Sequence, residues 1–430
     1  RAMVTEYGMS DLGPVQLEQQ TEGVFLGRDY NKSRNFSDTV AHEIDIEIRK
    51  IMDECYKKAT EILKENMDLV KLIANALLER ETLTKEQIEY LVEHKELPEE
   101  TTLNDLTLEE LNEIDRIYII ACGTAYNAGL MGKVAIEKLA KIPVEVEIAS
   151  EFRYREPLVT NKTLIITLSQ SGETADTLAV LRDAKKVGAK TLAVTNVVGS
   201  SISREADNVI YTMAGPEIAV ASTKAYTTQV VVMNLLGMYF ADLKGILDKD
   251  VEKELKESLL SLPEKIEAVL EMKSQVAEVS KILAEETDLF YLGRGADYAL
   301  VIEGALKVKE ISYVHSEAYA GGELKHGTIA LIEPGTKVIA ALTQSQLKDK
   351  MISNIREVKS RGAEIIAIAY EDEELDLTVF DKVLRIPRTS NMIAPILGAI
   401  QLQLMAYYVA SEKGCDIDKP RNLAKSVTVE

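Results

Sequence analysis

The segment 164–177 places hydroxyl side chains, a glycine and a helix start directly after an apolar strand, in the order Leu-Ile-Ile-Thr-Leu-Ser-Gln-Ser-Gly-Glu-Thr-Ala-Asp-Thr. Ser169, Ser171 and Thr174 can donate hydroxyl hydrogen bonds to one ligand. Gly172 lets the backbone approach that ligand closely, and the N–H groups and dipole of the next helix favour an anion. The segment therefore predicts a cradle for the phosphate of a small molecule, built without lysine.

An ordinary strand-to-helix turn is the alternative interpretation of this segment. A Ser or Thr at the N-cap is common in such turns and accounts for one hydroxyl. It does not account for four hydroxyls and Gln170 within nine residues.

Ionisable side chains gather in a second part of the chain. Glu303, Lys307 and Glu310 recur at spacings of four and three, which places them on nearly one side of a helix. His326 stands sixteen residues after Glu310. A carboxylate, an ammonium group and an imidazole are what is needed to open a sugar hemiketal and move a proton between adjacent carbons. The pattern therefore predicts acid–base chemistry on a sugar.

The same residues have less specific interpretations. Taken alone, Glu303 and Lys307 are more typical of a solvated ion pair on a helix surface. His326 is one of four histidines and is flanked by glycine and charged residues, so a buried core role is the less expected alternative for it.

Two kinds of periodicity divide the chain. Residues 37–92 repeat apolar side chains every three or four positions, which predicts helices, with Thr84 as the N-cap of the last one. The polar, proline-containing segment 95–102 predicts a domain boundary. Beyond it short apolar strands alternate with helical stretches, which predicts βαβ units and a parallel sheet. The expected strands are Arg116–Ala121, Val144–Ile148, Thr163–Leu168, Thr191–Thr195 and Asn208–Thr212.

An internal repeat predicts that this α/β region contains two homologous domains. Residues 338–345 align with residues 164–171, and residues 362–368 align with residues 188–194, both displaced by 174 positions. Upstream, a looser match joins the segments Ile119–Tyr126 and Tyr291–Tyr298.

The two copies differ at the cradle. The second copy has Gln346, Leu347 and Lys348 where the first has Gly172, Glu173 and Thr174. We therefore expect only the first domain to grip phosphate.

Composition excludes several classes of function. With 430 residues, 46% hydrophobic and 28% charged, the chain is typical of a soluble globular protein of two to four domains. A net charge of −20 argues against nucleic-acid binding. Cys55, Cys122 and Cys415 lie far apart, so we expect no disulfide framework and a reduced, cytoplasmic setting. No apolar run is long enough to predict a membrane span.

Several short motifs in the last three quarters of the chain are shared with one enzyme family. They are Ala121-Cys-Gly-Thr, Ala149-Ser-Glu-Phe-Arg-Tyr-Arg, Ser169-Gln-Ser-Gly-Glu-Thr, Val220-Ala-Ser-Thr-Lys, Glu303-Gly-Ala-Leu-Lys, Gly322-Glu-Leu-Lys-His-Gly and Pro420-Arg-Asn-Leu-Ala-Lys-Ser-Val-Thr-Val-Glu. On these motifs, residues from about 105 to 430 resemble the isomerase half of the glucosamine-6-phosphate synthases, the glutamine–fructose-6-phosphate aminotransferases.

The resemblance implies an α/β fold class: two tandem sugar-isomerase domains with parallel sheets flanked by helices, preceded here by an all-helical N-terminal segment. The expected divisions are a helical segment at 1–100, the first sugar-isomerase domain at 105–245, a helical connection at 246–284, the second domain at 285–418 and a C-terminal active-site loop at 419–430.

The resemblance also assigns substrate binding to residues of both domains. Some would hold the sugar phosphate and others would line the sugar. They are Thr124, Ser169, Gln170, Ser171, Thr174, Val220, Ser222 and Glu303. Ala125 departs from the family, because many relatives have a serine there, and this removes one hydroxyl from the phosphate site.

Catalytic roles follow from the same resemblance. Glu310 would move a proton between C1 and C2 as general base and then general acid, with Lys307 assisting. His326 would open the ring, reaching in from the neighbouring subunit, which predicts a homodimer. Lys425 would meet the ketone carbonyl of the open chain as a Schiff-base amine or an electrostatic partner. No cofactor and no metal are expected.

The expected ligands are fructose-6-phosphate, glucose-6-phosphate and glucosamine-6-phosphate. Family members carry a preceding glutaminase domain with an N-terminal cysteine, which this sequence does not contain, so we expect sugar-phosphate isomerisation without glutamine hydrolysis. The rival interpretation is a regulatory sugar-phosphate-binding module. The joint presence of Glu310, His326 and Lys425 favours the enzyme, because a sensor needs only the cradle.

The first hundred residues resemble a different family. The motifs at residues 1–10, 12–15, 25–29 and 37–45 are similar to the C-terminal helical part of the peptidase domain of membrane-anchored AAA+ zinc proteases. The segment His42-Glu43-Ile-Asp-Ile46 is not the zinc motif HExxH, because Ile46 replaces the second histidine. We expect a helical appendage without protease activity, and therefore a chimaeric chain.

Overall fold

The computed structural model describes residues 2–14, 37–80, 83, 85–96 and 107–425. The chain divides into two compact units, residues 1–100 and residues 101–430. Thr84, the protease-like motif at 25–29, most of the predicted boundary at 95–102 and residues 426–430 of the C-terminal loop lie outside the described residues. Within the described ranges, no helix is long and apolar enough to cross a membrane.

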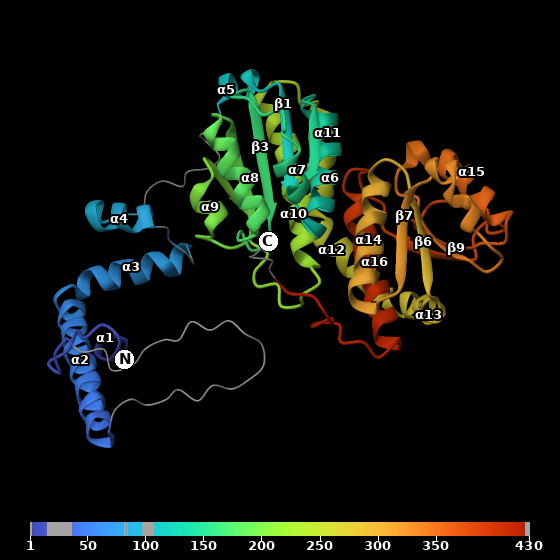
Figure 1. Ribbon diagram of the computed structural model, residues 1–430. Helices are drawn as coiled ribbons and strands as arrows, with labels where there is room; N and C mark the ends of the chain where they lie inside the picture. The colour runs from blue at the N-terminus through green and yellow to red at the C-terminus, as the bar shows by residue number, and fades with distance from the viewer. Residues whose placement is uncertain (1, 15–36, 81–82, 84, 97–106, 426–430) are drawn as a thin grey trace. The chain divides into compact units, whose positions relative to one another are not determined.

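The first unit is helical, as its periodicity predicts (Figure 1). Its helices are α1 (Ala2–Thr5), α2 (Asp38–Glu65), α3 (Met67–Arg80) and α4 (Lys85–His94). Ser37 caps α2, because its hydroxyl accepts a hydrogen bond from the Val40 N–H at 3.4 Å. His42 and Glu43 are exposed on α2. Among the described residues of this unit few large apolar side chains are fully buried, Ile44 and Leu91 being examples.

The second unit begins with a five-stranded parallel sheet in the order β2-β1-β3-β4-β5. The five expected strands are confirmed, with ends shifted by one residue in β3, β4 and β5. The elements are α5 (Leu108–Glu113), β1 (Arg116–Ala121), α6 (Gly123–Leu139), β2 (Val144–Ile148), α7 (Ala149–Tyr154), β3 (Thr163–Ser169), α8 (Ala175–Lys186), β4 (Lys190–Thr195), α9 (Ser201–Glu205), β5 (Asn208–Tyr211) and α10 (Lys224–Leu243).

A second parallel sheet repeats this topology in the order β7-β6-β8-β9-β10. Its elements are β6 (Asp288–Gly293), α14 (Ala296–Ser312), β7 (His315–Ala320), the 3₁₀ turns η1 (Glu323–His326), η2 (Thr328–Leu331) and η3 (Ser345–Leu347), β8 (Lys337–Ala341), α15 (Lys348–Lys359), β9 (Glu364–Tyr370), β10 (Lys382–Ile386) and α16 (Ala394–Glu412). The starts of β8, β9 and β10 lie 174 residues after those of β3, β4 and β5, which confirms the repeat.

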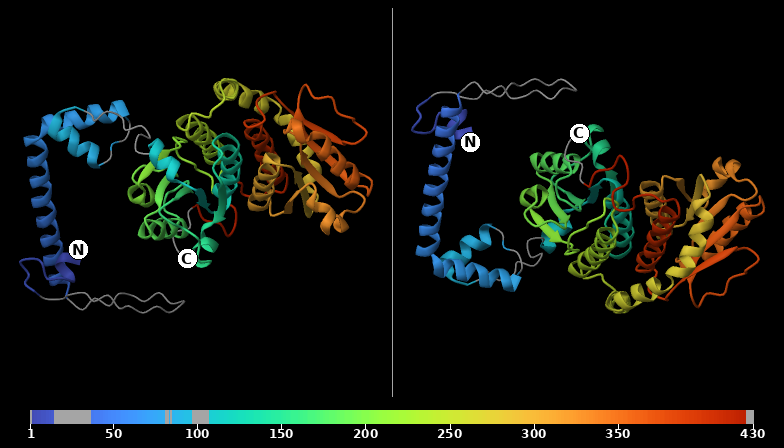
Figure 2. Two further views of the ribbon diagram at one scale, coloured as in Figure 1. Left: turned by 90° about the horizontal axis from the view of Figure 1, so that it is seen from above. Right: turned by 90° about the horizontal axis from the view of Figure 1, so that it is seen from below.

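Helices join the two sheets into one unit. Between the sheets, α6 packs against α10 and α14, and α14 packs against α16 (Figures 1 and 2). One hydrophobic core contains residues from both sheets and from these helices, including Ile119, Met233, Leu300 and Met405. The connecting helices α11 (Lys249–Leu260), α12 (Leu262–Glu271) and α13 (Lys273–Ala284) follow α10, and α12 and α13 pack on α16. The contact between α6 and α14 brings together residues that are far apart in sequence.

Candidate active site

The predicted phosphate cradle lies at the carboxyl end of β3, a strand buried along its whole length. The Ser169 Oγ atom accepts a hydrogen bond from the Gly172 N–H at 3.0 Å and lies 3.0 Å from Thr174 Oγ1. The Ser171 Oγ atom accepts from the Glu173 N–H at 3.2 Å. These local bonds curl the segment into a tight turn with three hydroxyls directly before α8.

The cradle differs from an ordinary capped turn in two respects. Thr174 occupies the N-cap of α8 but makes no side-chain capping bond. The Oε1 atom of Gln170 is buried and has no hydrogen-bond partner among the described residues. Buried polar atoms normally have partners, so a side-chain amide with an unused atom is available to a ligand at this turn.

The sheet topology places the cradle where ligands bind in folds of this kind. The strand order reverses between β1 and β3, and open parallel α/β sheets bind ligands outside the carboxyl ends of the strands at such a point. β1 leads directly into α6, which carries Thr124 in its first turn. Thr124 and the cradle therefore follow neighbouring strands at one sheet edge.

A buried ionic network links Thr124 to the second domain. The Lys307 Nζ atom lies 3.3 Å from Glu303 Oε1 and 2.5 Å from Glu310 Oε2, and it donates to Thr124 Oγ1 at 2.8 Å. Thr124 in turn donates to Glu303 Oε1 at 3.1 Å, and Asn127 Nδ2 donates to Glu303 Oε2 at 2.7 Å. The three ionisable residues lie on α14, whereas Thr124 and Asn127 lie on α6.

Burial decides how the charges of this network behave. Glu303 is 1% exposed and Lys307 is 2% exposed, so the interpretation as a solvated helix-surface pair is wrong. The α14 face that carries them packs on α6, which the spacing on α14 alone does not reveal. The Glu310 side chain keeps 23% of its surface exposed, so it alone of the three also faces outward.

The pKa values in the network move in directions set by that burial. Desolvation raises the pKa of Glu303 above its usual range, although Lys307, Asn127 and Thr124 oppose it. Desolvation acts to lower the pKa of Lys307, but the charges of Glu303 and Glu310 outweigh it and the net direction is upward. Lys307 is therefore a fixed cation between two carboxylates at neutral pH.

The loop before α10 and the C-terminal segment lie against each other. The Val220 N–H donates to the Asp418 carbonyl oxygen at 2.9 Å, and Lys425 Nζ donates to the Ala219 carbonyl oxygen. Glu217 holds this loop, because its carboxylate accepts from the N–H groups of Thr223 and Ala225 at 3.1 and 2.9 Å. Ser222 is also within reach of Glu217, with 3.5 Å between the two oxygen atoms.

Lys425 lies close enough to Lys307 for their charges to interact. Partial desolvation lowers the pKa of Lys425, Glu217 opposes the shift, and the charges of Lys307 and Lys224 reinforce it. A lowered pKa favours the neutral amine, which is the form that attacks a carbonyl.

The same C-terminal segment is tied to the end of α14. The Arg421 N–H donates to the Tyr313 hydroxyl at 2.9 Å, and the Arg421 guanidinium lies 4.1 Å from the centre of the Tyr313 ring. Tyr313 ends α14 in the left-handed region, with φ of 62°. The helix that carries Glu310 and the segment that carries Lys425 are therefore in direct contact.

His326 is the one predicted catalytic residue that the structure leaves apart from these groups. It is exposed at the end of η1 and has no hydrogen bond or ion pair within the part of the chain that the structure describes. The alternative of a buried core role for His326 is wrong.

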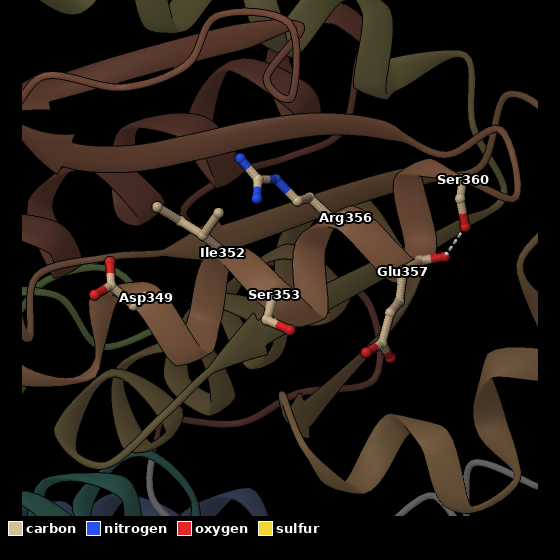
Figure 3. Close-up of a pocket in the computed structure, with 6 residues that line it drawn as sticks. All are labelled: Asp349, Ile352, Ser353, Arg356, Glu357 and Ser360. Carbon is tan, nitrogen blue, oxygen red and sulfur yellow. Dashed lines mark hydrogen bonds between the residues drawn. The ribbon is translucent and has the colours of Figure 1, made fainter.

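A surface pocket of about 530 Å³ lies elsewhere, on α15 (Figure 3). All of its lining side chains come from that one helix: Asp349, Ile352, Ser353, Arg356, Glu357 and Ser360. Glu357 is paired with Lys325 at 2.5 Å and Arg356 with Asp376 at 3.5 Å, so its charges are used within the protein. The pocket contains none of the predicted site residues and carries no functional assignment.

Two residues of the candidate site were missed from the sequence. Asn127 lies one helical turn after Thr124 on α6, so the i, i+3 spacing could have identified it once Thr124 was named. Glu217 has no comparable signal, because its partners are backbone N–H groups across a loop.

Gly172 offers a direct test of the cradle. Its φ is +65°, and a Cβ atom there would overlap the Ser200 side chain and lie 2.9 Å from Thr195 Oγ1. We expect Gly172→Ala to weaken binding of a sugar phosphate and to lower stability by at least about 1–2 kcal/mol, the cost of a left-handed conformation in a residue with a Cβ atom. Thermal unfolding with and without fructose-6-phosphate measures both effects.

Gly188→Ala is the matched control for that variant. Gly188 has φ of +81° but only an ordinary contact, with Asn161 Cβ at 3.7 Å, and it lies at the far end of α8. Its substitution should cost stability without changing ligand affinity. Equal ligand-induced shifts in the two variants would contradict a ligand role for the 169–174 turn.

Comparisons with known proteins match both parts of the chain. The SIS domain family matches residues 110–239 and 282–413, and Peptidase family M41 matches residues 1–91. The C-terminal domain of glucosamine-fructose-6-phosphate aminotransferase from Francisella tularensis superposes with a TM-score of 0.71 at 41% identity, covering 74% of this chain and 90% of that one.

Curated sequences give the same picture. Glutamine–fructose-6-phosphate aminotransferase [isomerizing] of Clostridium acetobutylicum is 61% identical over 76% of this chain and 54% of its own length. The protein of the same name from Methanosarcina acetivorans is 48% identical over 78% of this chain and 54% of its own length. The chain therefore spans about half the length of the curated relatives it matches.

Proposed function

The chain belongs to the SIS domain family, and from this premise we propose that it binds fructose-6-phosphate and interconverts it with glucose-6-phosphate, the synthase half of glucosamine-6-phosphate formation. The observation that carries the proposal is the buried network that ties Thr124, beside the cradle, to Lys307 and Glu310. It connects a phosphate-binding edge in one domain to an acid–base pair in the other.

The proposed division of labour follows the geometry. The turn of Ser169, Gln170, Ser171 and Thr174 holds the phosphate, using hydroxyl and amide donors and the N-terminus of α8. Binding the phosphate at one end fixes the distance from the sugar's C1 and C2 to the catalytic groups. Thr124, Val220, Ser222 and Glu303 line the sugar in this proposal.

Proton transfer is proposed for Glu310. Its carboxylate removes a proton from one of the carbons C1 and C2 and returns it to the other, while the O–H proton moves between the oxygens. Lys307, held positive by two carboxylates, stabilises the negative charge that develops on the enediol oxygen. Lys425 acts on the open-chain carbonyl.

Ring opening is assigned to His326. Because His326 is exposed in the single chain, its part in the reaction requires a second copy to present it, and a homodimer belongs to the proposal. We place the reaction in the cytoplasm, which agrees with the free thiols of Cys55, Cys122 and Cys415.

Residues 1–100 are proposed to be a helical appendage without protease activity, so that the chain as a whole is a chimaera. Neither metal-dependent proteolysis nor glutamine hydrolysis is part of the proposed function. The matched M41 region has Ile46 where a second zinc-binding histidine would be needed in the HExxH spacing of His42 and Glu43.

The test is a coupled assay on the purified chain, in which glucose-6-phosphate formed from fructose-6-phosphate is oxidised by glucose-6-phosphate dehydrogenase. We expect turnover, together with a rise in Tm on titration with fructose-6-phosphate, since a ligand at 100 times its Kd stabilises a protein by about 2.7 kcal/mol. A rise in Tm without turnover would favour the alternative function, a regulatory sugar-phosphate-binding module. Absence of both would contradict the proposal.

A further inference from the structure

The second domain has a buried carboxylate at the edge that corresponds to the cradle. Asp297, in the first turn of α14, is 2% exposed. Its oxygens accept hydrogen bonds from the Thr343 N–H at 2.7 Å, from the Gln344 N–H at 3.3 Å and from the Thr343 hydroxyl. These donors follow β8 directly. Burial raises the pKa of Asp297 to about 6, although the hydrogen bonds oppose the shift.

The repeat identifies these donors with those of the cradle. β8 begins 174 residues after β3, so Thr343 and Gln344 stand at the positions of Ser169 and Gln170. Both strands lie beside the strand at which the sheet order reverses, β6 in the second sheet and β1 in the first. The donors at the two sheet edges are therefore equivalent.

The helix that carries Asp297 is equivalent as well. Gly123, at the start of α6, and Gly295, before α14, both have positive φ, at 56° and 60°. Counting from these glycines, Asp297 stands where the first domain has Ala125. The first domain thus has a methyl group at the position from which the second domain projects an anion.

We infer that Asp297 is an internal anion that occupies the second domain's counterpart of the phosphate site. Each chain then keeps one open cradle, in the first domain. The inference rests on the proposed function in so far as the front turn is taken to bind phosphate. It also gives the absence of a second site a cause beyond the changes at Gln346, Leu347 and Lys348: the donors are present but are used by a side chain.

A helix-terminal carboxylate is often a simple complement to the helix dipole, and Asp297 differs from that case. Its bonds run to the segment after β8 and not to the N–H groups of its own helix. It is also buried, which a charge–dipole interaction does not require. These contacts are those of a ligand in a donor-lined site.

A small cavity of about 190 Å³ opens beside this position. Its lining includes Gly295, Ala296, Gln344 and Leu347 from the second domain, together with Lys138 from α6. A small anion can therefore reach the donors once the Asp297 carboxylate is removed. The charge of Lys138 favours its approach.

Chemical rescue tests the inference. Asp297→Ala leaves the Thr343 and Gln344 donors without their acceptor, so its Tm should fall. Sodium formate and inorganic phosphate should then raise the Tm of this variant in a concentration-dependent way, relative to sodium chloride at equal ionic strength. The wild-type chain and Asp297→Asn, in which an amide fills the same space, should show no such increase with formate.

A formate response of Asp297→Ala no larger than that of the wild type would overturn the inference. If Asp297→Ala does not fold, the pH dependence of wild type and Asp297→Asn decides. A folded pKa of about 6 against a usual 3.8 means that the folded state binds the extra proton first, so the wild type should gain stability relative to the Asn variant as pH falls from 7 to 4. Parallel curves would overturn it. Neither measurement uses turnover, so failure of the proposed isomerisation would be seen separately.

Discussion

Glu310→Gln should reduce the rate of fructose-6-phosphate isomerisation by about 10²–10⁴-fold, the usual contribution of a positioned general acid–base group. The amide keeps the size of the side chain but cannot accept the proton that must move between C1 and C2. The loss should appear in kcat, with little change in KM, because phosphate binding is assigned to the turn at Ser169–Thr174 in the other domain. Steady-state kinetics in the coupled assay measures both constants.

Glu310 is suited to this test because its neighbours fix it without burying it. Its carboxylate is held 2.5 Å from the Lys307 ammonium, yet 23% of the side chain stays exposed. The matched control is Glu267→Gln, an exposed glutamate on α12 outside the network. Retention of most of the wild-type rate by Glu310→Gln, with an unchanged Tm, would remove Glu310 from the mechanism.

Local sequence signals predicted the scaffold well because parallel strands in this fold are buried on both faces. Such strands appear as apolar runs, and Thr163–Ser169 is buried at every position. The repeat then transferred the first domain's strands to the second with a constant displacement of 174 residues. The hydroxyl-rich turn was predictable for the same reason: strand, turn and helix start are contiguous in sequence.

The ionic network could be predicted only in part. Spacing placed Glu303, Lys307 and Glu310 on one helix face, but it could not say what that face meets. Burial of the pair depends on α6, which precedes α14 by more than a hundred residues and supplies Thr124 and Asn127. A long-range contact of this kind leaves no periodic signal.

Contacts of the C-terminal segment were also beyond sequence reasoning. The bonds from Val220 to Asp418 and from Arg421 to Tyr313 involve backbone groups, which every residue possesses. Family resemblance supplied Lys425 as a site residue, but not the loop held by Glu217 against which the segment lies. The site is therefore predictable where chemistry and chain order coincide, and not where distant backbone segments meet.

Lys307→Met should lower the free energy of unfolding by about 3–5 kcal/mol, because removing one partner of a buried ion pair leaves the other charge uncompensated. Glu303 would remain buried beside Glu310, with only Thr124 and Asn127 as hydrogen-bond donors. The shift in the midpoint of urea unfolding measures the loss. Methionine is chosen because it retains most of the volume of the lysine side chain.

The double variant Glu303→Gln/Lys307→Met separates lost charge pairing from lost packing. With both charges removed, glutamine can still accept the hydrogen bond from Asn127, so a large part of the stability should return although the volume change at residue 307 remains. The pH dependence gives a second criterion. Burial already raises the pKa of Glu303, and loss of Lys307 raises it further, so the deficit of Lys307→Met should shrink as pH falls through that pKa and the carboxyl group becomes protonated. A deficit that is independent of pH and persists in the double variant would mean that Lys307 stabilises this interface by packing alone, and that the charges between α6 and α14 contribute nothing to holding it.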